Sequence, residues 1–281
     1  MSLSRELQLH ITQLKEIRSI LNAMKNLAFI ELHKLLHFKT MQGQAVATIE
    51  NAMQDFLSFY PCKVAPEEVT HLCILLGAER GFCGDFNESL INAITSQSYT
   101  GVIAVGSRLC NRLETLMTPV IARLEGANVA EEVPIIITGL LDTINVSPDF
   151  MLTEDAIPTL KLTIVYHDNN PNQINQRQLF PPFINKHDST PHFGTPPILN
   201  LSAEAFFAEL MDHYLFAALH EIFYMSLTAE NQRRLQHLEA AVNHLDDETT
   251  QIQKKSQIYR QEEITEEIEV ILLNAENNLL E

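Results

Sequence analysis

The residues most able to do chemistry lie in the loop at residues 77–84, which reads GAERGFCG. The loop follows a predicted strand and precedes a predicted helix, which is where α/β proteins bind nucleotide phosphates. Its glycines, Gly77, Gly81 and Gly84, match neither the dinucleotide-binding motif nor the phosphate loop, and no lysine follows them. The sequence therefore predicts no nucleotide cofactor. A small enzyme that binds a ligand at this loop remains an alternative.

Cysteine chemistry is the second candidate. A nucleophilic Cys83 would need a base beside its thiol, and no residue nearby in the sequence supplies one, although His71 could approach it in space. The alternative is a small buried thiol. The cysteines show no CxxC spacing and lie among apolar residues, which favours reduced thiols in a cytosolic compartment over disulfides or zinc. They are Cys62, Cys73, Cys83 and Cys110.

Two histidine pairs could bind metal. His33 and His37 have the i, i+4 spacing of a helical pair, but the glutamate of the catalytic zinc motif is missing. His187 and His192 lie near Asp188 in a proline-rich segment without a third ligand, where histidines are usually solvated. The sequence predicts neither a metal site nor a catalytic site.

The elements that position these residues include a long helix at each end of the chain. Each helix carries an apolar stripe with alternating steps of three and four residues, and a sustained period of 3.5 predicts left-handed supercoiling. Because such a stripe exposes apolar surface until another helix covers it, we expect the two distant segments to pack together. Ordinary bundle helices or a homodimeric coiled coil would show the same periodicity. The stripes are Leu14, Ile17, Leu21, Met24, Ala28, Glu31, Leu35 and Phe38, with Glu31 as the acidic exception, and Leu235, Leu238, Val242, Leu245, Thr249, Ile252, Ser256 and Tyr259.

The bounds of these helices follow from capping residues and prolines. The first is predicted from about Ser4 to Phe59, where Pro61 follows. The last begins after the N-cap Ser202 and continues to Leu280 without an internal proline, a length of about 115 Å at 1.5 Å per residue.

The middle of the chain alternates predicted strands with predicted helices, which favours an α/β layer with parallel strands. Residues 167–200 are rich in proline, asparagine and aspartate and are predicted as loop, hairpin or connector. The predicted strands are residues 71–77, 101–105, 133–137 and 160–166, and the helices are 86–94 and 109–116. The expected domains are therefore the first helix at 1–60, the α/β body at 61–200 and the last helix at 201–281.

Composition and charge exclude several function classes. A net charge of −17 argues against nucleic-acid binding, which needs clustered Lys and Arg. Residues 202–281 carry 16 acidic and 5 basic side chains, an excess that indicates either a solvated helix face or an acidic docking surface. The absence of a long apolar run and of a basic then apolar start predicts a soluble, unexported protein.

Four ordered segments carry a family resemblance. Residues 10–32 contain Ala23-Met24-Lys25 followed by Leu27-Ala28, and residues 209–240 contain Tyr214 and Arg234-Leu235. Residues 78–87 read AERGFCGDFN and residues 260–268 read RQEEITEEI. Together these segments resemble, in order, the motifs of the gamma subunit of rotary F-type ATP synthases, the central stalk. The matching loop residues are Glu79, Arg80, Gly81, Cys83, Gly84 and Asn87.

The resemblance implies a fold and a function. In this family the two terminal helices form an antiparallel coiled coil that enters a ring of alpha and beta subunits, and a Rossmann-like body lies near the membrane ring of c subunits. ATP is made or hydrolysed on the beta subunits, so this chain would be non-catalytic and would transmit torque. The implied partners are the alpha, beta and epsilon subunits and the c ring, with no cofactor, nucleic acid or small-molecule substrate. The implied location is peripheral, on the cytoplasmic side of the cell inner membrane.

The resemblance also implies roles for individual residues. Along the shaft it places Met24, Lys25, Arg260, Gln261 and Thr265 where catalytic subunits can touch them. Lys25 would pair with an acidic loop of a beta subunit, or be an ordinary surface lysine. Residues 270–273 would sit in an apolar bearing, or pack against the first helix. Near the foot, Phe206, Leu210 and Tyr214 would face the c ring and the epsilon subunit.

The sequence also departs from the family pattern. Past Ala28, where small and basic residues are usual, it reads FIELH, and its last helix is unusually acidic. These departures favour a divergent member, of a second or alternative rotary ATPase. The other interpretation is a stalk-like adaptor that has lost the motor role, which Glu31 in the seam and the weakened basic row support.

Overall fold

The computed structural model describes residues 3–61, 70–95, 99–115, 120–146, 160–168, 173–182 and 194–278. The chain divides into two compact units. The helical unit comprises Met1–Leu27 and Leu235–Glu281, and the body unit comprises Ala28–Arg234. Helices α1 (Leu3–Phe59) and α5 (Ala203–Asn278) contribute residues to both units.

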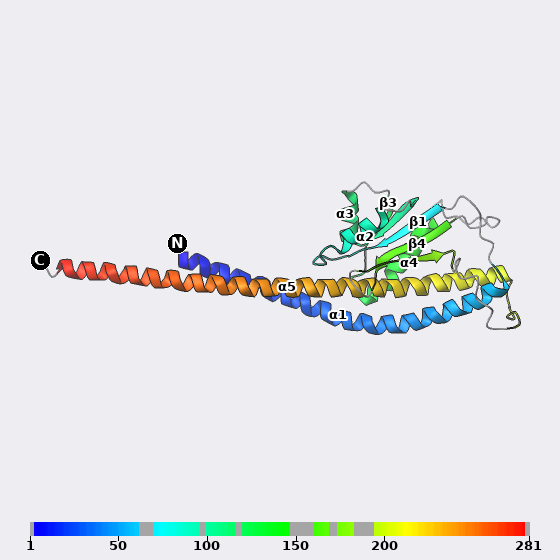
Figure 1. The fold of residues 1–281 in the computed structure, drawn as a ribbon, viewed down its shortest axis with the longest axis horizontal. Coiled ribbons are helices and arrows are strands. Elements are labelled where there is room, and N and C mark those ends of the chain that lie inside the picture. The colour runs from blue at the N-terminus through cyan, green and yellow to red at the C-terminus, as the bar shows by residue number, and fades with distance from the viewer. Residues whose placement is uncertain are drawn as a thin grey trace. The chain divides into compact units, whose positions relative to one another are not determined.

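The body unit contains a five-stranded sheet in the order β3-β2-β1-β4-β5 (Figure 1). The first four strands in this order are parallel, and β5 pairs antiparallel with β4. This mixed sheet confirms the predicted α/β layer. The strands are β1 (Thr70–Leu76), β2 (Gly101–Val105), β3 (Val120–Leu124), β4 (Leu160–His167) and β5 (Ile174–Phe180).

Alternation along β1 builds a separate core on each face of the sheet. Leu72, Ile74 and Leu76 pack with residues of α1, α4 and α5, whereas Cys73 and Leu75 pack with residues of α2 and α3. Because successive side chains of a strand point to opposite faces, a strand buried on both faces reads as a continuous apolar run. The helices of the middle region are α2 (Phe86–Thr95), α3 (Ser107–Glu114), the short 3₁₀ helix η1 (Ala130–Glu132) and α4 (Val133–Val146).

The strand predicted at residues 133–137 was wrong, because this segment is the start of α4. The buried residues Val133, Ile137, Leu140 and Ile144 recur at steps of four, three and four, which is the helical period. The short run VPIII is apolar at every position, so periodicity within it could not separate strand from helix. Pro134 is compatible with the first helical turn, where its missing N–H costs nothing.

Two edge strands complete the sheet. β3 was not predicted, and its burial alternates between half-buried and exposed residues, as expected where only part of a strand is covered. β5 lies inside the segment predicted as loop, hairpin or connector, and its antiparallel pairing with β4 makes that segment in part a hairpin. Its sequence INQRQLF is too polar to signal a strand by composition.

The predicted ends of the long helices are largely confirmed. α1 begins at Leu3, one residue earlier than predicted, and ends at Phe59. Ser202 caps α5, since its Oγ accepts a hydrogen bond from the backbone N–H of Ala205 at 3.2 Å.

In the helical unit, α1 and α5 lie side by side and run antiparallel (Figure 1). Leu21 packs with Leu238 and Val242 in one apolar cluster. Arg18 pairs with Asp246 at 2.5 Å and Lys25 lies 3.9 Å from Glu239, so the α5 residue number falls as the α1 number rises. The other buried stripe residues of this unit are Leu14, Thr249, Ile252 and Ser256, while Leu235 and Leu245 are half-buried.

Two predicted stripe residues of this unit lie outside the contact. Ile17 is 46 % exposed and Tyr259 is 39 % exposed. Ile17 lies next to Arg18, whose ion pair with Asp246 forms the contact at this level. The covered face of α1 is therefore narrower here than the heptad pattern predicted.

Gly106 allows a direct test of the turn between β2 and α3. It joins β2 to α3 with φ +114°, and a Cβ there would lie 2.7 Å from the Gly77 carbonyl oxygen. We expect Gly106→Ala to lower the free energy of unfolding by about 3 kcal/mol, from backbone strain and this clash. Urea denaturation measures the change.

Gly139 supplies the matched control. It lies within α4, and a Cβ added there meets nothing within 4 Å. Gly139→Ala should raise the free energy of unfolding by about 0.5–1 kcal/mol through helix propensity. Equal effects of the two substitutions would contradict the described turn at Gly106.

Candidate functional site

The loop after β1 is held by its own side chains. The Glu79 carboxylate accepts hydrogen bonds from the Ser107 N–H at 2.8 Å, the Ser107 hydroxyl at 2.7 Å and the Gly126 N–H at 2.6 Å. Asn87 Oδ1 accepts a bond from the Ala78 N–H at 2.9 Å. A carboxylate of the chain therefore occupies the N-terminus of α3, where a nucleotide phosphate would otherwise find its donors. This geometry supports a shaping role for Glu79, which joins the loop to the start of α3 and to Gly126.

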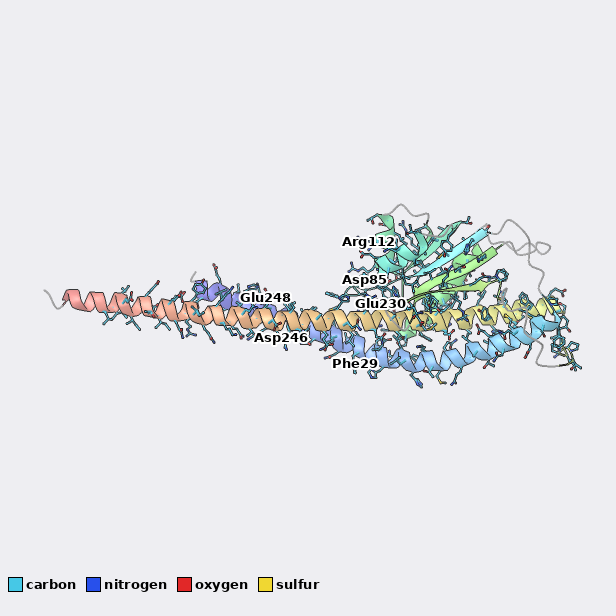
Figure 2. The ribbon with its side chains drawn as sticks, in the orientation of Figure 1. Phe29, Asp85, Arg112, Glu230, Asp246 and Glu248 are labelled. Carbon is cyan, nitrogen blue, oxygen red and sulfur yellow. The ribbon has the colours of Figure 1, made fainter. Side chains whose placement is uncertain are left out.

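The other side of the loop is fastened to α5 by what we call the α5 clamp, comprising Glu230, Arg233 and Arg234. Arg234 forms an ion pair with Glu230, and its Nε donates to the Gly81 carbonyl at 3.3 Å. Arg233 forms an ion pair with Asp85. Figure 2 labels Asp85 and Glu230, which mark the loop and the helix joined by the clamp.

Backbone and sulfur contacts complete the α5 clamp. The Arg80 N–H donates to Glu230 Oε1 at 3.4 Å, and Arg234 Nη2 lies 3.6 Å from Cys83 Sγ. Arg234 Nη1 also donates to Asn231 Oδ1 at 2.9 Å. The family loop motif is thus in contact in space with Arg234, which belongs to the motif at residues 209–240. Sequence spacing gave no sign of this, because the two segments are about 150 residues apart.

Burial shifts the pKa values of Glu230 and of Cys83, which lies beside the α5 clamp. Glu230 is 4 % exposed, and burial raises its carboxyl pKa, an effect that the Arg234 charge opposes. Burial also raises the pKa of the Cys83 thiol to about 12, and the Glu230 charge adds to this rise. Cys83 is therefore a neutral buried thiol at neutral pH and a poor nucleophile. His71 does not contact it, because His71 lies on β1 with Nε2 2.9 Å from Thr163 Oγ1.

Asp85 differs because it stays largely in solvent. The hydrogen bond from Arg233 lowers its carboxyl pKa. A lowered pKa means that this pair stabilises the fold at neutral pH and that the stabilisation is lost as the pH falls through the folded-state pKa. Its magnitude is small, because solvent screens an exposed carboxylate.

A second set of contacts, the α1 clamp, comprises Glu31 and Lys34 with the segment at η1. Glu31 is 8 % exposed, and its Oε1 accepts a hydrogen bond from the Ala130 N–H at 2.7 Å. Lys34 Nζ lies 3.0 Å from Glu31 Oε2 and 2.8 Å from Glu131 Oε1. The acidic exception in the stripe is therefore a buried acceptor that holds the start of η1, and it is not a defect of a helix seam.

The predicted shaft residues lie in the helical unit. Met24 is half-buried beside the cluster of Leu21, Leu238 and Val242, and Lys25 faces Glu239. Arg260, Gln261 and Thr265 are exposed, and the Thr265 hydroxyl donates to the Gln261 carbonyl at 2.9 Å. Gln261 and Thr265 therefore share one face of α5, with the Thr265 hydroxyl bonded to its own helix.

The predicted foot residues lie in the body unit and are mostly covered. Tyr214 is 2 % exposed, and its ring belongs to the main core. Phe206 is half-buried, with its ring 5.1 Å from that of Phe56, and Leu210 is half-buried. The ring of Tyr214 thus supports this region from inside.

The predicted histidine pairs do not form a metal site in the described residues. Within the described ranges, no group of three or more His, Cys, Asp or Glu residues could hold a metal ion. His33 and His37 are exposed on α1, whereas His187, Asp188, His192 and Cys62 lie outside the described residues. None of the helices in the described part of the chain combines the length and apolarity needed to cross a membrane.

Breaking the buried pair tests the α5 clamp. We expect Glu230→Gln to lower the free energy of unfolding at pH 7 by about 3–5 kcal/mol, because it leaves the Arg234 charge buried without a counter-ion. The matched control is Asp85→Asn, which removes the exposed pair and should cost about 0–1 kcal/mol. Chemical denaturation gives both values, and equal losses would contradict an ionised buried pair.

Thiol alkylation tests the state of Cys83. At pH 8 the native protein should react with iodoacetamide at Cys83 much more slowly than the urea-unfolded protein, because the thiol is buried and its pKa is raised. Glu230→Gln should speed the reaction by loosening the loop. Peptide mass spectrometry reports the modified fraction, and native labelling at the unfolded rate would rule out the described packing.

Comparisons with known proteins agree with this architecture. A family model described as ATP synthase matches residues 4–276. The search of the curated proteins found no significant match.

Solved structures share the fold at low sequence identity. A chain of the rotor of the Euglena gracilis mitochondrial ATP synthase has a TM-score of 0.64 and 11 % identity, covering 93 % of this chain and 98 % of that one. A chain in the OSCP/F1/c-ring structure from the same organism has a TM-score of 0.65 and 13 % identity, covering 96 % and 92 %. A chain of the Tetrahymena thermophila central stalk and c ring has a TM-score of 0.52 and 15 % identity, covering 79 % and 99 %. Since the family model spans nearly all the described residues, the chain belongs to the ATP synthase gamma-subunit family.

Proposed function

We propose that this chain is the central-stalk rotor subunit of a rotary F-type ATP synthase or ATPase, transmitting torque between a membrane c ring and a catalytic ring of alpha and beta subunits. The match to the family over residues 4–276 is the observation that carries this proposal. The chain itself is non-catalytic in this proposal and needs no cofactor. Its partners are the alpha, beta and epsilon subunits and the c ring, and it works peripherally at the cytoplasmic side of the inner membrane.

The proposed shaft is an antiparallel, left-handed coiled coil of the two terminal helices. The apolar cluster around Leu21 and Leu238 and the ion pair of Arg18 with Asp246 support it. The proposed body is Rossmann-like, and its parallel order β3-β2-β1-β4 is compatible with that fold. The proposed functional domains are the first helix at 1–60, the α/β body at 61–200 and the last helix at 201–281.

The mechanism is transmission of rotation without chemistry on this chain. A rod with different side chains on its different faces presents a different surface to each catalytic subunit around it. A catalytic subunit then favours the open or closed state according to the contact energy that each state makes with the rod. Turning the rod moves these contacts from one subunit to the next.

The exposed end of α5 is the proposed contact with the ring. Arg260, Gln261 and Thr265 would face catalytic subunits, and Met24 and Lys25 would do so from α1. The apolar residues Ile264, Ile268, Val270, Ile271 and Leu272 are between 47 % and 65 % exposed. Residues of this kind in water indicate a surface that a partner covers, which supports the bearing proposed for residues 270–273.

The foot is the proposed contact with the c ring and the epsilon subunit. Phe206 and Leu210 retain part of their surface for such a contact. Tyr214 would act indirectly, by fixing α5 beneath them. The contact is expected to centre on exposed neighbours of these residues.

The alternative is a stalk-like adaptor without a motor role. Two sequence features favoured the adaptor, and one of them was Glu31, interpreted as a break in the helix seam. Glu31 instead accepts a hydrogen bond from the Ala130 N–H within the body unit. The weakened basic row after Ala28 remains in its favour.

Co-expression with the cognate alpha and beta subunits tests the proposed function. We expect a purified complex whose ATPase activity exceeds that of the alpha–beta ring alone and depends on this chain. A chain deleted from Ile264 onward should assemble with lower activity, because it lacks the exposed apolar end of α5. Folded alpha and beta subunits that never retain this chain would favour the adaptor.

A further inference from the structure

Arg177 connects the sheet to both long helices. It lies on the edge strand β5, and its side chain is 22 % exposed. Its Nη2 lies 2.7 Å from Glu50 Oε1 on α1, and its Nη1 lies 2.8 Å from Glu221 Oε2 on α5. The guanidinium carbon is 5.9 Å from the centre of the buried Tyr214 ring. One planar side chain thus holds a carboxylate from each helix.

The two helices approach each other closely at this level. Gln42 of α1 donates from Nε2 to the Ala217 carbonyl of α5 at 3.1 Å. A Cβ at Gly43 would lie 3.3 Å from Glu221 Oε1, so a larger residue would press on the carboxylate that Arg177 holds. The Arg177 contacts therefore sit where α1, α5 and the edge of the sheet meet.

The chemistry of this contact makes it sensitive to axial position. Apolar packing is non-directional, whereas the guanidinium presents its donors in a rigid fork. A slip of α1 against α5 by one turn would move a carboxylate by about 5.4 Å, which breaks at least one arm of the fork. The α1 clamp and the α5 clamp do not fix α1 against α5 in this way, because the first joins α1 alone to η1 and the second joins α5 alone to the loop after β1.

We propose that Arg177 is a positioning residue that fixes the axial register of α1 against α5 in the body unit, so that torque applied to the body turns both helices together. The effect on torque rests on the proposed rotor function, whereas the register of α1 against α5 is a property of this chain alone. Loss of Arg177 leaves the apolar core in place and removes the fork that discriminates between registers. The expected defect is therefore slippage under load, with catalysis on the ring largely preserved.

The register is tested first on the isolated chain. Spin labels on the exposed positions Gln44 of α1 and His213 of α5, in a background with Cys62 replaced by Ser, report the distance between the helices. In the labelled chain that keeps Arg177 we expect a single narrow distribution of label-to-label distances. In Arg177→Met we expect this distribution to be broader or to have a different mean distance. The control is Arg123→Met. Arg123 lies on the opposite edge strand, β3, and pairs with Glu114 of α3. Identical distributions in the two variants would overturn the inference, whatever the fate of the rotor proposal.

The coupling is tested on the whole complex in inverted membrane vesicles. ATP hydrolysis and ATP-driven charge uptake, followed with a dye that responds to membrane potential from either proton or sodium transport, are measured on the same preparation. We expect Arg177→Met to keep ATPase activity within about twofold and to lower charge uptake per ATP by about threefold or more, because hydrolysis takes place on the ring whereas charge uptake depends on the rotation that the rotor transmits. Arg177→Lys should restore part of the uptake, and Arg123→Met should match the unchanged chain.

The outcomes separate the two proposals. If the unchanged chain neither joins the complex nor raises its ATPase activity, the rotor proposal fails. The distances between the spin labels on the isolated chain still test the register of α1 against α5. If Arg177→Met assembles and pumps as well per ATP as Arg123→Met, the role of Arg177 is refuted. If Arg177→Met does not fold by circular dichroism, Glu50→Gln and Glu221→Gln each remove the charge from one arm. Each should then lower uptake per ATP with little change in melting temperature, and unchanged uptake in both would refute the role.

Discussion

A charge inside the body unit must have a partner, and the placement of these partners determines much of the structure around the loop after β1. Glu230 is 4 % exposed and Arg234 is 6 % exposed, so the desolvation of either one alone would be costly. Their pairing leaves further donors and acceptors that the loop satisfies, through the Arg80 N–H and the Gly81 carbonyl. The position of the loop then places Glu79 against Ser107 and Gly126. A single buried ion pair on α5 is thus linked to the starts of α3 and of the segment after β3.

The same principle recurs where α1 meets the body. Glu31 binds the start of η1, and Arg177 of β5 binds Glu50. Apolar side chains supply most of the burial in this core, and the polar contacts select one arrangement among those that burial would allow. The proposed rotor function would need this combination, since a sheet that could shift on α1 and α5 would dissipate torque.

The sequence predicted the parts that depend on local periodicity. The stripes at both ends, the strands β1, β2 and β4 and the cap at Ser202 all follow from residue spacing within one element. The family resemblance came from short motifs and was confirmed across the chain. The sequence could not show why those motifs occur together, because Arg234 reaches the loop at Gly81 only in the folded chain.

The failures have physical causes. The run VPIII at residues 133–137 has no apolar-polar contrast, so its helical burial became visible only with Leu140 and Ile144 included. Glu31 looked like a break in a seam because its acceptor role depends on Ala130, which is 99 residues away. Tyr214 was placed at a partner surface by its motif, whereas its ring is in the core. Both Glu31 and the loop after β1 form polar contacts with residues far away in the sequence. The pattern of a single sequence does not reveal such contacts.

The proposed function requires that this chain turns as a rotor while the catalytic ring hydrolyses ATP. The most direct measurement fixes the alpha–beta ring to a surface and follows a bead attached through a cysteine introduced at the exposed Arg112 of the body unit. If the chain is the rotor, ATP drives continuous rotation of the bead in one direction, in steps that match the symmetry of the ring. ATP hydrolysis at the full rate with the bead only diffusing about a fixed angle would refute the rotor function.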